Sequence, residues 1–490
     1  MNGSTTDETL GLVKSAQNAQ DAIAKAITQS TGLVAYNLEA PSKKLFPVLT
    51  PLRNKIPRNS NGKGTAVNWK AITGINTGMT GAGVSEGNRG GLVATTVTNY
   101  SVGYKGIGLE DYVTFEAEDA GKTFEDVRAT AAINLLRATM IAEESTILGA
   151  NMSMALGQTP TPTVAAVASG GSIATGVVCS VVCVALTNEG YNRSSLAGGI
   201  PQVVSKTNAD GSVDTFGGGS AIKSAGANVT TAANNSSITA SVAPVTGAVG
   251  YAWYLGTVGA EKLAAITTIN SVLLTAVPGA GQTAASLDTA DHSTNALLYD
   301  GLLTYAMNPT SGGYFKQMPN GVAGTGTPLT STTQAGVAEI EAALLWFWQT
   351  YKLSPDEIYL SAQELVNITN KVIANGGSPI LRFNMDATGQ HVAISAGALV
   401  GTYLNKFTGK LIKLVLHPNM VAGTIMFITW ETPYPVSGVA NVFEIELRRE
   451  YYQLDWPIRT RKREMGVYCD GVLKNYVPFA QGCITNIGNG

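Results

Sequence analysis

The sequence predicts an α+β fold that carries an inserted, all-β region near its middle. Apolar residues recur at helical spacing in segments before and after residues 151–290. Short Val/Thr-rich runs, separated by Gly, Asn and Pro, fill residues 151–290 themselves and are typical of short strands. Two further strand-like runs, joined by a glycine-rich stretch, precede the first helix and predict a long hairpin.

The composition excludes several classes of protein. The chain has 490 residues, of which 13% are charged, and its net charge is −2. Because 44% of the residues are hydrophobic, disorder driven by charge repulsion is excluded, and no excess of Lys and Arg is available to bind phosphates. Residues 1–10 lack a basic cluster followed by an apolar core, and the longest apolar stretches (177–186 and 344–348) are far shorter than the ~20 residues that span a bilayer. We therefore expect no secretory signal, no membrane span and an origin in the cytoplasm.

The first 108 residues have the pattern of segments that cannot fold alone. Residues 1–57 contain one weakly amphipathic stretch (6–28) and then a run interrupted by Pro41, Pro47, Pro51 and Pro57. Residues 67–72 and 93–104 are strand-like, and the glycines between them predict a flexible hairpin tip. A lone two-stranded hairpin is marginal in water and has unpaired edges, so we expect neighbouring subunits to order it.

Three helices are expected outside the insert. The first would begin at Thr123, with Asp126 at the capping-box position, and continue to about residue 148. The second spans about 334–352, and the third begins at Ser361, with Glu364 completing a capping box, and ends at 376–377. Residues 392–447 are mostly strand-like, including 410–416 and 424–429. Glu143 and Glu144 lie on the first helix, where we expect a solvated or intersubunit face.

The central region differs sharply from its flanks in charge. Nine of the 140 residues in 151–290 are charged, compared with 57 of the other 350, which predicts a separately folded insert. Its expected strands predict a β-sandwich, with Tyr251, Trp253 and Leu255 on one face of a strand. Cys179 and Cys183 share a face and, without an accompanying His, are expected to be buried thiols rather than metal ligands or a disulfide. The expected strands cover residues 176–186, 236–242, 250–255 and 267–274.

The order of these elements resembles the major capsid proteins of tailed bacteriophages, which have the Hong Kong 97-type fold. Local phrases support the resemblance, among them LYDGLLTYA (298–306), PDEIYLSAQELVNIT (355–369), GKLIKLVLHPNMVAGTIMFI (409–428) and the ending that begins YYQLDWPIRTRKREMG at residue 451. The stretch APVTGAVGYAWYLGT (243–257) resembles a strand of an immunoglobulin-like or fibronectin type III-like module. The resemblance implies an N-terminal arm (1–57), an extended loop (58–108), a peripheral domain with a spine helix (109–155), an inserted immunoglobulin-like sandwich (156–290), an axial domain with part of the peripheral domain (291–440) and peripheral return strands (441–490).

The resemblance also implies a function. Such a chain assembles with itself into pentamers and hexamers that form an icosahedral shell around double-stranded DNA, without sequence-specific DNA binding. It would be made in the host bacterial cytoplasm and reside in the virion, with a separate scaffolding protein, a portal and possible cement or decoration proteins as partners. The insert would lie outside, either as decoration or for weak contact with carbohydrate or the host surface. The alternatives are an encapsulin-like cage and a multidomain surface adhesin.

Charged residues in the loop and near the C-terminus are the candidate intersubunit contacts. Around the C-terminal cluster six basic and five acidic residues alternate, which favours reciprocal ion pairs over DNA binding. Some members of the family cross-link a loop Lys to an Asn, for which Lys63, Lys70, Lys105 and Asn441 are available, but salt bridges are the simpler interpretation. The candidate contacts are Lys63, Lys70, Arg89, Arg448, Arg449, Arg459, Arg461 and Arg463.

No enzymatic chemistry is predicted. The stretches GAGVSEG (81–87) and GVAGTGTP (321–328) lack the spacing and the Lys-Ser/Thr of a phosphate loop. The three histidines, His292, His391 and His417, are far apart in sequence, and His417 before Pro418 is expected to have a structural or surface role. We expect no catalytic residues, no metal and no cofactor.

Overall fold

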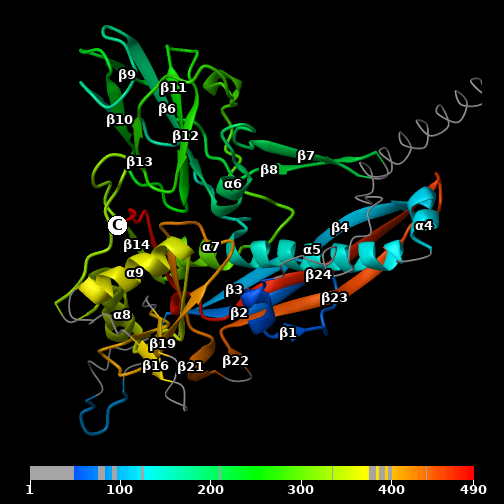
Figure 1. Ribbon diagram of the computed structural model, residues 1–490. Helices are drawn as coiled ribbons and strands as arrows, with labels where there is room; N and C mark the ends of the chain where they lie inside the picture. The colour runs from blue at the N-terminus through cyan, green and yellow to red at the C-terminus, as the bar shows by residue number, and fades with distance from the viewer. Residues whose placement is uncertain are drawn as a thin grey trace, which may run out of the picture.

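The computed structural model describes residues 49–490 except 75–82, 91–95, 123–125, 209–210, 334, 375–381, 386–391, 396–399 and 437–438. Its elements confirm a mixed α+β chain, in which runs of consecutive strands are separated by a few helices. Two β-rich bodies lie at one end of the long helix α5, and a set of long strands follows that helix toward its other end (Figure 1). The expected amphipathic stretch at 6–28 lies outside the described residues.

The N-terminal elements lead into a hairpin whose base is attached to its own chain. Strands β2 and β3 pair antiparallel from Ala66↔Gly103 onward, as the sequence predicts. Val67, Trp69 and Ala71 are buried against Val472, which lies near the C-terminus. Neighbouring subunits are therefore not needed to hold the base of the hairpin, although its opposite face stays exposed. The elements are α3 (Pro51–Lys55), β1 (Arg58–Asn59), β2 (Ala66–Gly74), β3 (Thr96–Gly103) and β4 (Lys105–Thr114).

A long helix lies on a sheet made from both ends of the chain. The sheet has the order β1-β23-β24-β4, and β24 pairs antiparallel with both of its neighbours. Leu135 of the helix packs with Val113 of β4 and with Met465 and Val467 of β24. The elements are α4 (Phe115–Gly121), α5 (Val127–Gly149), β23 (Phe443–Asp455) and β24 (Lys462–Asn475).

Helix α5 begins later than predicted. Its N-cap is Asp126, whose side chain accepts a hydrogen bond from the Ala129 N–H at 3.0 Å. Asp126 has extended backbone geometry, so it acts as the cap rather than as the third residue of the helix. The expected cap, Thr123, lies outside the described residues.

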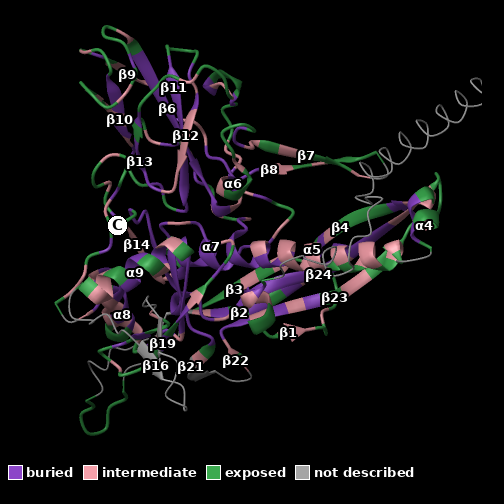
Figure 2. Cartoon of the chain, in the orientation of Figure 1, coloured by how far each residue is buried: buried purple, intermediate pink, exposed green. Residues whose placement is uncertain are grey.

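The central region forms two antiparallel sheets that share a core. The sheets have the orders β13-β10-β5 and β12-β11-β6-β9, and their strands are largely buried (Figure 2). Tyr251, Trp253 and Leu255 lie in one apolar cluster with Cys179 and Cys183, and both thiols are free and buried, as predicted. The strands are β5 (Thr163–Val167), β6 (Val178–Leu186), β7 (Val203–Thr207), β8 (Val213–Gly217), β9 (Ala227–Thr230), β10 (Ser237–Ser241), β11 (Gly250–Gly256), β12 (Lys262–Thr267) and β13 (Ser271–Leu274), with the short helices α6 (Asn188–Arg193) and η1 (Ala284–Ser286).

Two features of this region differ from the prediction. The single strand expected over 267–274 is the end of β12 and the whole of β13, separated by a turn. Strands β7 and β8 form a ribbon that extends away from the two sheets (Figure 1).

The rest of the chain builds a six-stranded sheet with the order β14-β25-β20-β15-β19-β18. Helices α7, α8 and α9 accompany it, and their apolar residues join its strands in the largest core of the described chain. The elements are α7 (Leu302–Met307), η2 (Pro309–Ser311), β14 (Tyr314–Gln317), α8 (Ala338–Tyr351), β15 (Glu357–Leu360), α9 (Ala362–Ala374), β16 (Arg382–Met385), β17 (Val392–Ser395), β18 (Thr402–Leu404), β19 (Leu411–Leu416), β20 (Ile425–Ile428), β21 (Glu431–Val436), β22 (Val439–Asn441), η3 (Pro478–Ala480) and β25 (Gly482–Thr485).

The predicted strands at 410–416 and 424–429 are β19 and β20, whereas the helix predictions need correction. Helix α8 begins at Ala338 rather than near 334. Ser361 does cap α9 by accepting from the Glu364 N–H at 3.4 Å. The Glu364 carboxylate accepts from the Gly423 N–H at 3.0 Å, so this tertiary contact replaces the return half of the capping box. The expected end of α9 at 376–377 lies outside the described residues.

Candidate functional site

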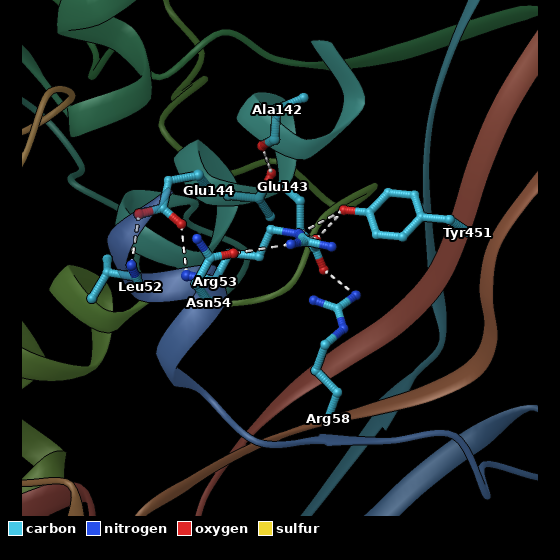
Figure 3. Close-up of polar contacts among 9 residues, drawn as sticks. Leu52, Arg53, Asn54, Arg58, Ala142, Glu143, Glu144 and Tyr451 are labelled. Carbon is cyan, nitrogen blue, oxygen red and sulfur yellow. Dashed lines mark hydrogen bonds and ion pairs between the residues drawn. The ribbon is translucent and has the colours of Figure 1, made fainter. Parts of the chain in front are cut away.

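A charged junction is buried where the segment 51–58 meets helix α5. Glu143 and Glu144 are consecutive residues in the second half of the helix, and they are only 1% and 0% exposed. The expectation of a solvated or intersubunit face for these two residues is therefore wrong. Figure 3 shows that the segment lies across this part of the helix and that both carboxylates face it. A buried carboxylate is tolerated only when it is paired and hydrogen-bonded, so the partners of each define the junction.

Glu143 holds two arginines and a tyrosine. Arg53 Nε lies 2.9 Å from Glu143 Oε2, Arg58 Nη2 lies 3.0 Å from Glu143 Oε1, and the Tyr451 hydroxyl donates to Oε2. Burial lowers the pKa of Arg58, but the charge of Glu143 and its hydrogen bond together outweigh this with smaller contributions from Tyr451 and Cys469, and the net pKa is raised, so the guanidinium stays charged. Burial, followed by the Glu143 charge, raises the pKa of Tyr451 and keeps its hydroxyl protonated as a donor. Glu143 thus ties α3 and β1 to the helix and to β23.

Glu144 binds the backbone of α3 directly. Its two oxygens accept hydrogen bonds from the N–H groups of Leu52 and Arg53, at 2.9 and 2.7 Å. A carboxylate at a helix N-terminus also interacts favourably with the helix dipole. On its other side, His417 Nε2 lies 2.7 Å from Glu144 Oε1, and both side chains are completely buried. The sequence predicts either a structural or a surface role for His417. Its burial supports the structural role and excludes the surface role.

Two further contacts hold the segment 51–59 beyond its junction with α5, and we call the whole set of contacts made by this segment the anchor. Lys55 Nζ lies 2.6 Å from Glu357 Oε1 of β15 and 4.7 Å from the ring centre of Trp430. Burial raises the pKa of Glu357, but hydrogen bonds from Lys55, Trp430 and Tyr359 outweigh it, and the net pKa is lowered.

The second contact is made to β23, in the sheet beneath α5. Asn59 Nδ2 donates to Glu444 Oε1 at 2.9 Å, and this oxygen also lies 3.1 Å from Lys474 Nζ. The segment 51–59 is therefore joined to α5, to the six-stranded sheet and to β23. These contacts fix the position and the direction of the segment 51–59 on the rest of the described chain.

The candidate contacts of the hairpin are all exposed. Lys63, Lys70 and Arg89 lie on the surface, and none makes an ion pair with another residue in the described ranges. Lys105 is occupied, since its Nζ donates to the Ala296 carbonyl at 2.6 Å. Asn441 is on β22. The cross-link between a loop Lys and Asn441 stays an untested hypothesis.

Four of the five C-terminal arginines already have partners in their own chain. Arg448 pairs with Asp470 at 3.1 Å, and Arg449 lies over the Tyr452 ring. At the far end of the sheet, Arg461 pairs with Glu116 and Arg463 with Glu118, at 2.7 and 3.0 Å. Arg459 is exposed and has no ion-pair partner among the described residues. The alternating charges thus form contacts within the subunit, and ion pairs between subunits stay a prediction.

Sequence reasoning missed Arg53, Arg58 and Tyr451 as parts of the junction. The available signal was the adjacent Glu143–Glu144 pair among small and apolar residues, because such a pair is compatible with burial only if bases from elsewhere neutralise it. Arg53 lies 90 residues before Glu143 in the sequence and Tyr451 lies 308 residues after it, and local patterns do not encode contacts over such separations.

Neither a metal centre nor a membrane helix stands out in the part of the chain that the structure describes. Within the described ranges, no group of three or more His, Cys, Asp or Glu side chains could hold a metal ion. Likewise, none of the described helices is both long and apolar enough to cross a bilayer.

Comparison with known proteins gives remote likenesses only. No family model matches the chain, and no curated protein matches it. The capsid asymmetric unit of cyanophage A-1(L) is 11% identical with a TM-score of 0.43, over 94% of this chain and 99% of that one. The capsid of a native GTA particle is 8% identical with a TM-score of 0.38, over 94% and 99%. The holo-SrpI encapsulin complex from Synechococcus elongatus is 8% identical with a TM-score of 0.35, over 94% and 95%. Likenesses this remote leave the function to be argued from the chain's own architecture.

Proposed function

We propose that the chain is the major capsid protein of a tailed bacteriophage, with the Hong Kong 97-type fold. It assembles with itself into pentamers and hexamers that close into an icosahedral shell around double-stranded DNA. The observation that carries the proposal is the sheet beneath α5. Strand β24, near the C-terminus, lies between β23 and β4, the strand that directly follows the hairpin. The family resemblance implies this return of the C-terminal strands to the sheet.

The order of the other elements supports the same proposal. An anchored N-terminal segment is followed by the hairpin β2–β3, the 23-residue helix α5, the two-sheet region and the six-stranded sheet. We assign residues 1–57 to the arm, 58–108 to the extended loop, 109–155 and 441–490 to the peripheral domain, and 291–440 to the axial domain with part of the peripheral one.

Residues 156–290 are proposed to be an inserted immunoglobulin-like sandwich on the outer surface. The ends of this region lie side by side, since the Leu156 N–H donates to Ser293 Oγ at 2.9 Å and the Gly157 N–H to Asp291 Oδ2 at 2.7 Å. Two sheets also enclose a core of their own. Adjacent ends and a separate core are the features expected of a domain inserted into a loop of another.

The hairpin supplies a surface for assembly. Its buried face, with Trp69 stacked on Tyr100 at 5.4 Å, fixes its base, whereas Lys70 and Val97 are exposed. The exposed face of a two-stranded ribbon gains stability when another chain covers it. We therefore propose that the hairpin lies over an adjacent subunit and that Lys63, Lys70 and Arg89 contact that neighbour.

The remaining parts of the proposal follow from a shell of this type. A separate scaffolding protein, a portal and possible decoration proteins are the expected partners, and assembly takes place in the host bacterial cytoplasm. The enclosed DNA is held without sequence-specific contacts, because the basic residues of β23, of β24 and of the connection between them are largely paired with acidic residues of the same chain.

Electron microscopy of the purified full-length protein tests the proposal. Closed shells are expected when the protein is produced with its phage assembly partners, and nuclease-protected DNA in particles from infected cells separates a capsid from an empty or cargo-filled cage. The proposal would be overturned if the protein stayed monomeric both when produced with its phage assembly partners and in infected cells. The double variant Lys63→Glu, Lys70→Glu is expected to reduce particle yield, whereas Lys413→Glu, which changes an exposed lysine on β19, serves as the matched control.

A further inference from the structure

A cavity of about 300 Å³ opens beside the four-stranded sheet of the central region. It lies over the face of β6 that carries Ser180 and Val182, opposite the face that packs Cys179 and Cys183 against the other sheet. The turn before β12 and the short helix η1 complete its wall, with Gly259 and Ala284 among the lining residues. Its volume is at the small end of the ~300–1,000 Å³ typical of ligand sites, which suits a single ring rather than a drug-sized molecule.

Three polar groups converge on this cavity. Glu261 is only 5% exposed, and one of its oxygens accepts from the Gly259 N–H at 3.1 Å. Lys223 Nζ donates to the carbonyls of Ala284 and Leu287, at 2.8 and 2.9 Å, which leaves one of its three hydrogens for another acceptor. Ser180 is 1% exposed, and its hydroxyl faces the Glu261 carboxylate, where it helps to lower the pKa of that group against the effect of burial.

A glycine keeps the space between these groups open. A Cβ added to Gly226 would lie 2.8 Å from Ser180 Oγ and 3.8 Å from Glu261 Oε1. Any side chain at this position would therefore occupy the volume that a ligand needs.

We propose that this cavity binds one neutral sugar ring of a glycan. A sugar hydroxyl can donate to the Glu261 carboxylate and accept from Lys223, and Ser180 orients the carboxylate. The single negative and single positive charge balance, so neither an anion nor a cation is favoured. The apolar wall at Val182, Val258 and Ala284 can cover the C–H face of the ring.

This inference rests on the proposed function, in which the central region is displayed on a shell. One such site would bind weakly, because few hydrogen bonds are available and each contributes little net free energy. A shell that repeats the site many times could still attach firmly to a glycan-covered surface.

Saturation-transfer NMR on the assembled full-length protein tests the site. The probes are D-glucose, D-galactose, D-mannose and N-acetyl-D-glucosamine, each as the free monosaccharide. We expect saturation transfer to at least one of them. In Ser180→Ala and Glu261→Gln the affinity should be about tenfold lower, which is the effect of losing one hydrogen bond, and the loss is greater where the bond involves a charged group. Gly226→Ala is expected to abolish the signal by filling the cavity.

Gly279→Ala is the matched control, because a Cβ there meets nothing within 4 Å and the residue belongs to the same region. Transfer that is equal in wild type and in all three cavity variants, or absent with every sugar, would overturn the site. Electron microscopy of the same samples keeps the two proposals apart. Intact shells without sugar binding would refute only the cavity, whereas a failure to form shells would refute the proposed function.

Discussion

Two sets of ion pairs at opposite ends of helix α5 contain the same residue types in different surroundings. At one end, Arg53 and Arg58 meet Glu143 in a site where the carboxylate side chain is 2% exposed. At the other end, the Arg461 and Glu116 side chains are 80% and 43% exposed. Exposed pairs contribute about 0–1 kcal/mol, whereas removing one partner of a buried pair costs roughly 3–5 kcal/mol because a charge is left uncompensated. The comparison teaches that the stability of the subunit depends on the first set, and that the second set is free to change without unfolding it.

The largest effect is expected from Glu143→Ala. The substitution leaves Arg53 and Arg58 without their common counter-charge, so the free energy of unfolding should fall by about 3–5 kcal/mol. Urea unfolding of the unassembled subunit, followed by tryptophan fluorescence, measures it.

Glu143→Gln provides a milder form in case the alanine variant does not fold, and Glu116→Ala is the exposed control. A loss at Glu143 no larger than at Glu116 would contradict the difference between the two ends.

A smaller and more local effect is expected from Glu144→Gln. An amide nitrogen would replace one oxygen that accepts from the backbone of α3 or from His417, which should cost about 1–3 kcal/mol. Because the contact holds α3, trypsin should cleave faster after Arg53, Lys55 and Arg58, as measured by mass spectrometry of timed digests.

Glu118→Gln, at the half-buried pair with Arg463 near the other end of α5, should leave those cleavage rates unchanged. Equal rates in the Glu144 variant and wild type would show that α3 is held mainly by other contacts.

Acid should weaken the same anchor through Glu357 and Glu444. For Glu444, burial raises the pKa, but hydrogen bonds from Asn59 and Lys474 outweigh it, and the net pKa is lowered, as for Glu357. A carboxylate with a lowered folded-state pKa contributes stability above its unfolded pKa, about 4.3, and this stability is lost as the pH falls through the lowered value. The melting temperature should therefore fall below about pH 4.3, and Glu357→Gln should flatten that decline. A decline of equal slope in the variant would exclude Glu357 as a source.

The smallest effect on the folded subunit is expected from Arg461→Ala. Its pair with Glu116 is exposed, so the free energy of unfolding should change by no more than about 1 kcal/mol. Particle yield, measured by sedimentation, is the informative readout. A clear loss of particles without a loss of stability would place this end of the sheet at a subunit contact, whereas unchanged yield would remove Arg461 from the candidate contacts.

Sequence patterns predicted the elements better than their ends. The strands around Tyr251 and at 410–416 follow from local alternation and β-branched residues, and the structure contains both. The sequence places the N-cap of α5 at Thr123, whereas the structure has it at Asp126. Both residue types are good caps, and the local sequence does not choose between them. The Glu364 capping box was half right because Gly423, a residue brought near by the fold, offers its N–H to the carboxylate.

The α+β class, the charge-poor central region, the hairpin and the burial of Cys179 and Cys183 follow from the sequence alone, because each depends on residues that are close together in the chain. The burial of Glu143 and Glu144 against the segment 51–58, and of His417 against Glu144, becomes visible only in the folded chain. The same holds for the pairing of most C-terminal arginines within the subunit. The physical reason is that the state of a charged side chain depends on which distant groups the fold places around it, and a pattern of neighbours in sequence carries no record of that environment.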